Sequence, residues 1–479
     1  MTFNSWEFLL FYPIVLALYF ILPKIAKWPM LLVASYFFYM CYSPELVFLI
    51  FGTTAISWIS AGIIEAKKSA AIRRTALIIT LLTSLGVLFF YKYFDFLSKS
   101  LFGIMDREPV LLNLLLPVGI SFYTFQTLSY VIDVYRGDAK AEKNFLLYAL
   151  FVSFFPQLVA GPIERPGNLI SQLREPHKWS SENALAGAKL MILGFFKKIC
   201  VADLISGAVD TVYSAPKDAS SLAIVIATAL FAVQIYCDFS GYTDIAIGSA
   251  RIMGIRLMKN FDRPYRSESV KEFWGRWHIS LSGWFRDYLY IPLGGSRCAK
   301  WRHLFNLFLV FFLSGLWHGA EWTFVIWGIV HAVYRIVGEI TAKPRAKLIS
   351  RLGLSEKKLP MCYARRILTL ILVIAAWIPF RANNISDLGV LLTNLFTRFE
   401  GIGETFKLFG LSGVGAMLIA VSILLLWFMD GLVTYEGVGE GSAALSKNGA
   451  FIYFVWIILI VWTLLISNDM ISAFIYFQF

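Results

Sequence analysis

The sequence has few charged residues and none of the motifs that mark common soluble enzymes. Charged residues make up 15% of the 479 residues, against 58% hydrophobic and 16% aromatic residues, and the mean hydropathy is +0.67. The chain contains no HExxH, no GxSxG, no P-loop and no dinucleotide-binding fingerprint. These absences argue against a metalloprotease, a serine hydrolase of the common kind and an ATP-driven pump.

Cysteine is also scarce. The five cysteines show no CxxC spacing, so they predict neither a metal site nor a disulfide framework. The net charge of +12 comes from basic residues that are divided among short segments between apolar runs. This distribution is typical of the cytoplasmic loops of a membrane protein and does not indicate nucleic acid as a partner.

Long apolar stretches follow one another from Trp6 to Ile471, and about 20 apolar residues suffice for one membrane-spanning helix. We therefore predict an all-α, polytopic membrane helical bundle that forms a single integral-membrane domain over residues 1–479. It should hold about 11–12 spanning or re-entrant helices plus interfacial amphipathic helices. The first apolar run has no basic n-region and no cleavage site, which favours a retained helix over a signal peptide. The expected spans lie near residues 8–22, 29–41, 45–63, 75–91, 111–132, 186–206, 221–249, 304–317, 322–338, 367–380, 411–429 and 450–470.

Two further segments depart from simple spans. Residues 145–165 are apolar but contain Pro156, Gly161 and Pro162, which interrupt helical hydrogen bonding and predict a re-entrant segment. In residues 251–302, tryptophans share one stripe of a helical pattern, which predicts an amphipathic helix in the cytoplasmic interface. Counting spans outward from the basic loop 343–366 places the tail 471–479 outside the cytoplasm.

Only five histidines are present, and His318 is the most informative. It ends an apolar run that starts at Leu304 and is too short to cross the membrane, so the chain should turn with His318 at membrane depth. A neutral imidazole there could accept a proton from an attacking hydroxyl or thiol. A packing histidine with a hydrogen-bonded neighbour fits the spacing equally well.

The other histidines and the buried aspartates fit structural roles at least as well as catalytic ones. His278 borders the tryptophan stripe and fits a polar residue at the headgroup level, while His331 fits a packing role. Asp238 and Asp244 lie inside an apolar run, where they either pair with a basic group such as Arg251 or line a polar tunnel. The remaining histidines, His177 and His303, are typical loop residues.

Six segments, in order along nearly the whole chain, resemble the membrane-bound O-acyltransferase family, and most of all its branch that acts in alginate O-acetylation. They are PVGISFYTFQ (117–126), VAGPI (159–163), DFSGY (238–242), FWGRWHISLS (273–282), RDYLYIPLGG (286–295) and GLWHG (315–319). The resemblance implies that His318 is catalytic at the waist of a central tunnel between the two membrane faces. It also implies that His278 lies close to the same passage.

The last residues, FIYFQF (474–479), are similar to an FxYxxF ending that occurs in this family and in the partner peptide of D-alanylation systems. The resemblance implies that Tyr476 carries the acyl group as a catalytic intermediate. An aromatic membrane-belt residue is the alternative for Tyr476. Because a tyrosine hydroxyl has a pKa of about 10, a tyrosyl ester has a better leaving group than a sugar ester.

The resemblance therefore implies a multi-pass enzyme of a bacterial cytoplasmic membrane that moves an acetyl group, by way of Tyr476, to an extracellular polysaccharide. The donor would be acetyl-CoA or an acyl carrier protein, with no bound cofactor and no metal. The expected partners are an extracytoplasmic acetyltransferase or the polysaccharide itself, together with membrane lipids. D-alanyl transfer, peptidoglycan O-acylation and a transporter or flippase remain the alternatives.

Overall fold

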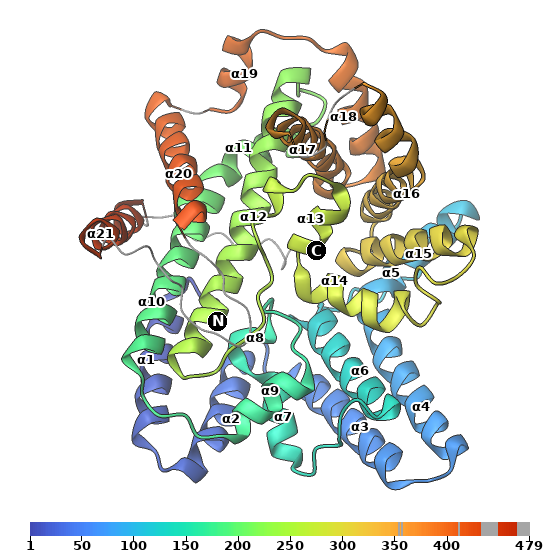
Figure 1. Cartoon of the computed structure of the whole chain (residues 1–479), viewed down its shortest axis with the longest axis vertical. Helices are drawn as coiled ribbons and strands as arrows, with labels where there is room; N and C mark the ends of the chain where they lie inside the picture. The colour runs from blue at the N-terminus through green and yellow to red at the C-terminus, as the bar shows by residue number, and fades with distance from the viewer. Residues whose placement is uncertain (353–354, 356–357, 411, 433–448, 467–479) are drawn as a thin grey trace. The chain divides into compact units, whose positions relative to one another are not determined.

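The computed structural model describes residues 1–352, 355, 358–410, 412–432 and 449–466 (Figure 1). Every regular element in these residues is helical, so the predicted all-α class is confirmed. The described residues form two compact units, Met1–Phe195 with Gly241–Lys259, and Phe196–Ser240 with 260–432 and 449–466. They are called the first and the second unit below.

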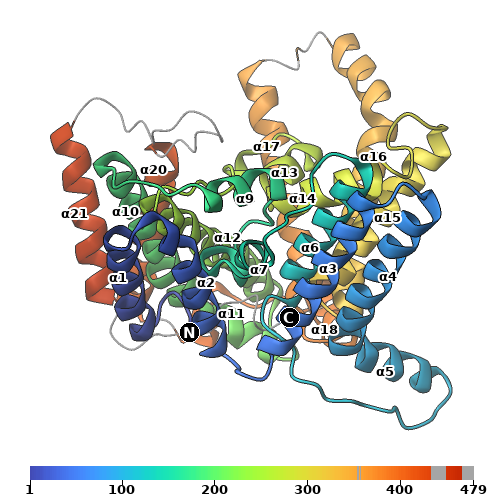
Figure 2. The same cartoon turned by 90° about the horizontal axis from the view of Figure 1, so that it is seen from below.

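In the described residues, the first unit contains ten helices and the end of α12, with a π-helical turn between α4 and α5. The helices are α1 (Trp6–Ile21), α2 (Lys24–Met40), α3 (Val47–Ala66), α4 (Ala70–Leu88), α5 (Phe94–Ile104), α6 (Ile120–Arg136), α7 (Phe145–Ser153), α8 (Phe155–Leu158), α9 (Pro166–Arg174) and α10 (Ser181–Phe195). Helices α3, α4 and α6 pack side by side, as both views show (Figure 1, Figure 2).

The second unit begins with a π-helical segment, Phe196–Asp203, that continues α10. Its described helices are α11 (Leu204–Ser214), the first part of α12 (Ser221–Ile252), α13 (Val270–Arg276), α14 (Ile279–Phe285), α15 (Lys300–His318), α16 (Trp322–Arg351), α17 (Leu359–Arg381), α18 (Ile385–Thr397), α19 (Ile402–Leu408), α20 (Gly413–Leu432) and α21 (Gly449–Ile466). Helices α15 and α16 form an antiparallel hairpin, and α17 packs on α16.

Five described helices are long and apolar enough to cross a membrane, or six if the bent pair α19–α20 counts as one span. Helices α1, α18 and the end of α21 are apolar but shorter. This is the composition of a multi-pass membrane protein. The five are Val47–Ala66, Ala70–Ile104, Ser221–Ile252, Trp322–Arg351 and Leu359–Arg381.

The predicted span 111–132 is wrong at its start, because α6 begins only at Ile120. Pro117 and Gly119 precede it, and Gly119 takes φ +73, a left-handed conformation that favours glycine. A Cβ at Gly119 would also lie 2.5 Å from the carbonyl oxygen of Leu158. The apolar residues before Pro117 therefore do not extend the helix.

The predicted break in 145–165 is present between α7 and α8. Its backbone groups are satisfied by buried side chains: Gln126 and Gln157 both donate to the Phe151 carbonyl at 2.8 Å. Ser35 Oγ accepts from the Phe155 amide at 3.1 Å. Such internal partners are what a non-helical backbone needs where water is excluded.

Glycines bring α10 and the end of α12 into direct backbone contact in the first unit. A Cβ at Gly187 would lie 2.5 Å from the Gly248 carbonyl oxygen, and one at Gly194 would lie 2.5 Å from that of Gly241. Small residues spaced in this way allow close packing between apolar helices, where interhelical van der Waals contact replaces the hydrophobic drive.

Candidate active site

His318 is the last residue of α15, and glycines fix its position. A Cβ at Gly315 would lie closer than 3.0 Å to the Phe324 carbonyl oxygen and 3.2 Å from Gly328 Cα of α16. A Cβ at Gly319 would overlap the Phe324 ring. The glycines of the GLWHG segment therefore let α15 lie backbone to backbone on α16 and let the chain turn immediately after His318.

Aromatic rings enclose the His318 side chain, which is only 4% exposed. The ring centroids of Trp317 and Trp327 lie 5.0 Å from that of His318, and the ring of Phe380 in α17 lies 5.6 Å away. All three rings stand nearly perpendicular to the imidazole. This apolar surrounding favours the neutral form of the ring, which can act as a base.

His278 is fully buried in a turn between α13 and α14. Its backbone takes φ 44 and ψ 56, a left-handed conformation that costs a residue other than glycine on the order of 1–3 kcal/mol. The sequence prediction of one continuous amphipathic helix is therefore wrong here, because the chain leaves the helix at Trp277 and starts again at Ile279.

The tryptophans of that stripe are also not at an interface. Trp274, Trp277 and Trp284 are at most 9% exposed, so they pack inside the second unit. Trp274 Nε1 donates to His331 Nδ1 at 3.2 Å, and the Trp277 ring packs against Trp377 at 5.2 Å. Periodicity identified the apolar side chains correctly but could not distinguish protein from lipid as their surroundings.

The structure brings the two predicted histidines together. The ring centroids of His278 and His318 are 6.3 Å apart, and Trp317 lies 5.7 Å from His278. Phe239 of the DFSGY segment stands edge-on to His278 at 4.7 Å. Burial lowers the pKa of His278 to about 3, so this imidazole is neutral at physiological pH.

Asn260 holds His278 in place, and the sequence patterns gave no sign of it. Asn260 Oδ1 contacts His278 Nδ1 at 3.1 Å and accepts from both the amide (3.2 Å) and the hydroxyl (2.9 Å) of Ser280. The Asn260 carbonyl accepts from the Ile279 amide at 2.9 Å. Asn260 precedes His278 by 18 residues, but the chain between them is not one continuous helix, so only the fold reveals the contact.

The buried acid Asp238 pairs with a lysine rather than with Arg251. Lys198 Nζ lies 2.6 Å from Asp238 and 2.8 Å from Asp203, and all three side chains are buried. Arg251 instead donates to Asn183 in the first unit. Asp238 of α12 is thus one of two carboxylates that share a single lysine in a buried ion cluster.

The remaining histidines make local contacts. In the second unit, His303 contacts the Tyr290 hydroxyl at 2.9 Å, and in the first unit, His177 contacts the Gln172 carbonyl at 3.0 Å. Tyr476 and the tail 471–479 lie outside the described residues. Among the residues that the structure describes, no group of three His, Cys, Asp or Glu side chains could hold a metal ion.

Known proteins resemble this chain over most of its length. Residues 141–349, which include His278 and His318, match the membrane-bound O-acyltransferase family. A probable alginate O-acetylase, AlgI, of Pseudomonas aeruginosa is 40% identical over 80% of this chain and 73% of its own length. The protein of the same name from Pseudomonas putida is 35% identical over the full length of both chains. A peptidoglycan O-acetyltransferase of Helicobacter pylori is 33% identical over 81% of this chain and 78% of its own.

These matches and the two buried histidines agree on one class of enzyme. The matches cover between 73% and 100% of the length of each of the three relatives. The chain is an O-acyltransferase and belongs to the membrane-bound O-acyltransferase family.

Proposed function

We propose that this enzyme takes an acetyl group from cytoplasmic acetyl-CoA and delivers it, through an ester on Tyr476, for O-acetylation of an extracellular polysaccharide. The enzyme would act in the cytoplasmic membrane of a bacterium. The observation that carries the proposal is the burial of His318 and His278 side by side, with ring centroids 6.3 Å apart. The names of the relatives support acetyl as the group and alginate as the first polymer to test.

In the first step, the Tyr476 hydroxyl attacks the thioester carbonyl carbon of acetyl-CoA. His318 takes the hydroxyl proton, the new C–O bond forms, the C–S bond breaks, and the proton passes to the leaving thiolate to give CoA. General-base assistance of this kind contributes about 10²–10⁴-fold. The aromatic rings around His318 exclude water, which would otherwise hydrolyse the thioester.

In the second step, a hydroxyl of the polysaccharide attacks the tyrosyl ester on the outer side. The C–O bond to Tyr476 breaks and the tyrosine hydroxyl is restored, either directly or through an extracytoplasmic acetyltransferase partner. Because a tyrosine hydroxyl is far more acidic than a sugar hydroxyl, the transfer from tyrosyl ester to sugar ester runs downhill.

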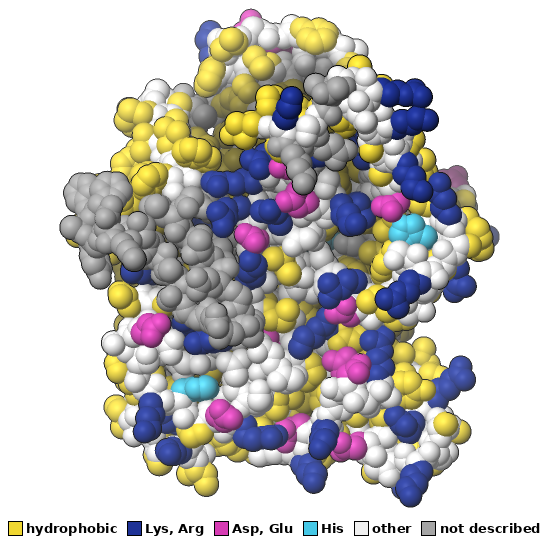
Figure 3. Space-filling view, viewed as in Figure 1, with side chains coloured by type: hydrophobic (Ala, Val, Ile, Leu, Met, Phe, Trp, Pro, Cys, Tyr) yellow, Lys and Arg dark blue, Asp and Glu magenta, His cyan; other side chains and the backbone are white. Residues whose placement is uncertain are grey.

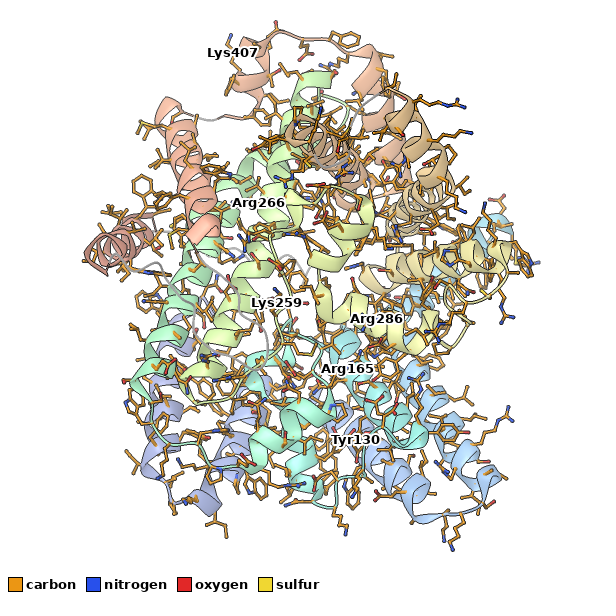
Figure 4. All side chains as sticks on the ribbon, viewed as in Figure 1. Tyr130, Arg165, Lys259, Arg266, Arg286 and Lys407 are labelled. Carbon is orange, nitrogen blue, oxygen red and sulfur yellow. The ribbon has the colours of Figure 1, made fainter. Side chains whose placement is uncertain are left out.

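The donor is anionic, and basic side chains of the second unit suit it. Arg266 precedes α13 and Arg286 follows α14 (Figure 4), and Lys and Arg side chains are visible over this region in the space-filling view (Figure 3). Arg365 and Arg366 pair with Glu268. Arginines bind phosphate groups through charge-assisted hydrogen bonds, which supports a CoA-type donor.

The test is mass spectrometry of the C-terminal peptide after purified enzyme has been incubated with acetyl-CoA. We expect an acetyl group on Tyr476 in the wild type, none in Tyr476→Phe, and at least a 100-fold slower appearance in His318→Ala. His303→Ala is the matched control, because the recorded polar contacts of His303 are with the Tyr290 hydroxyl, the Gly295 carbonyl and Glu339. Equal labelling of wild type and His318→Ala would refute the assignment of the base.

Peptidoglycan is the second candidate acceptor, because one relative carries the name peptidoglycan O-acetyltransferase. Ester content distinguishes the two polymers. Exopolysaccharide and peptidoglycan from cells with and without the gene are hydrolysed with mild base, and released acetate is measured. Loss of ester from the exopolysaccharide alone supports the proposal, and loss from peptidoglycan alone overturns it.

A further inference from the structure

The turn that carries His278 is capped by a residue from another part of the chain. His278 occupies the N-cap position of α14, but its side chain does not cap that helix. The first amides of α14 point instead at Asn260: the Ile279 amide donates to the Asn260 carbonyl at 2.9 Å, and the Ser280 amide donates to Asn260 Oδ1 at 3.2 Å. One asparagine therefore satisfies two amides that a helix start leaves open.

The same contacts define which nitrogen of His278 carries the proton. The atom of Asn260 that faces the Ser280 amide must be an acceptor, because a backbone N–H can only donate. That atom, Oδ1, also lies 3.1 Å from His278 Nδ1. Nδ1 must therefore hold the hydrogen of the neutral ring, and Nε2 must hold the lone pair.

The segment around Asn260 is itself fixed to the segment around His278. The Asp262 amide donates to the Arg276 carbonyl at 2.9 Å, on the other side of the turn from the Ile279–Asn260 bond. Asn260 is fully buried. These bonds hold the left-handed conformation of His278, which the chain would otherwise leave because it is strained.

We propose that Asn260 is a positioning residue for the acyl transfer: it fixes His278 in the Nδ1–H tautomer and holds its strained turn, so that Nε2 of His278 carries the lone pair of the ring beside His318, the general base. This inference rests on the proposed function, because it assigns His278 a part in the reaction. Asn260 does not touch the reacting atoms and acts through His278. A buried amide fills the orienting role that a carboxylate or backbone carbonyl has beside many functional histidines.

Asn260→Ala and Asn260→Asp test the inference in the acetylation assay at Tyr476. In Asn260→Ala the ring loses its acceptor, and we expect a roughly 10–100-fold lower single-turnover rate, the range seen when a histidine loses its orienting partner. The acetyl-CoA concentration that gives half the maximal rate should not change. In Asn260→Asp the acceptor is retained, so the rate should return to within about tenfold of wild type.

The pH profile separates orientation from a merely structural role. The carboxylate of Asn260→Asp stabilises an imidazolium at His278, so the rate should begin to fall at a higher pH on the acid side than in the wild type. Ser282→Ala is the matched control, because Ser282 lies in α14 just after the turn and its hydroxyl donates to the Trp277 carbonyl rather than to Asn260 or His278. Its rate and profile should match the wild type.

The outcomes distinguish the inference from the proposed function. If His278→Ala is inactive while Asn260→Ala reacts at the wild-type rate, positioning by Asn260 is refuted and the function stands. If His278→Ala acetylates Tyr476 normally, the role of His278 in the reaction fails, and the inference fails with it. If Asn260→Ala does not fold, Asn260→Asp decides alone: an unshifted pH profile overturns the inference.

Discussion

Replacing Gly315 by alanine adds one methyl group between α15 and α16, three residues before His318. The two helices are closest there: a Cβ on Gly315 would lie closer than 3.0 Å to the Phe324 carbonyl oxygen and 3.2 Å from Gly328 Cα. Each of these atoms belongs to the backbone of α16, so no side chain can rotate away. The helices must separate to accommodate the alanine.

The size of the effect follows from the separation that is needed. Ordinary contact requires at least 3.4 Å, so α15 must shift by about 1 Å, a misplacement that can lower a rate by about 100-fold. The lost packing should also destabilise the fold by about 1–3 kcal/mol. The rate should change more than the stability, because His318 lies at the displaced end of α15 whereas its aromatic neighbours Trp327 and Phe380 lie on α16 and α17. The shift therefore moves the imidazole relative to the rings around it.

Two measurements check this: the rate of Tyr476 acetylation and the thermal unfolding midpoint in detergent. Gly338→Ala is the control, because Gly338 lies in α16, the helix that α15 packs on, but an added Cβ there meets nothing within 4 Å. Alanine is favoured over glycine in a helix by about 1 kcal/mol, so Gly338→Ala should keep its activity and be no less stable. A Gly315→Ala enzyme with wild-type rate and unfolding midpoint would show that the helix contact does not position His318.

Two further predictions concern buried charge. Lys198→Met leaves Asp203 and Asp238 buried without their lysine, so it should lower the free energy of unfolding by about 3–5 kcal/mol, as measured by denaturant or thermal unfolding. The control Lys217→Met changes an exposed lysine and should alter stability by less than about 0.5 kcal/mol. Equal effects of the two substitutions would refute the role of the cluster. Burial raises the pKa of Glu164 from 4.5 to about 7, so its contribution to stability is present below pH 4.5 and is lost as the pH rises to 7, on the order of 3 kcal/mol in all. Glu164→Gln should flatten the unfolding midpoint between pH 5 and 8, and an unchanged slope would contradict this.

The sequence predicted the features that depend on local composition. Apolar length predicted the helical membrane class, and Pro156 with its neighbouring glycine and proline predicted the break after α7. The short run before His318 predicted a turn there, and α15 does end at His318. In each case the cause lies within one segment of the chain. The hydropathy of the apolar runs determines the membrane helical class, and the missing amide hydrogen of proline and the missing Cβ of glycine cause the helix to break.

Features that depend on distant residues could not be predicted in this way. The 274–288 stripe has helical spacing, yet the bonds from Asn260 to Ile279 and Ser280 hold a left-handed residue in its middle. Residues 111–119 are apolar, yet Leu158 occupies the space that a side chain at Gly119 would need. A helical pattern reports which side chains avoid water, and it contains no information on a partner that approaches from elsewhere in the chain.

The GLWHG segment combines a feature that is visible in the local sequence with one that depends on another helix. Its histidine is a candidate base from the sequence alone. Its glycines are required by contacts with α16: Gly315 faces the backbone at Phe324 and Gly328, and Gly319 faces the Phe324 ring. Ring packing then places Phe324 against Phe380 at 4.9 Å, and Phe380 lies 5.6 Å from His318. Phe324, which leaves no room for a side chain at Gly319, thus also packs against Phe380, one of the rings around His318. For this reason a larger residue at Gly319 should impair the reaction through the Phe324–Phe380 contact as well as through His318 itself.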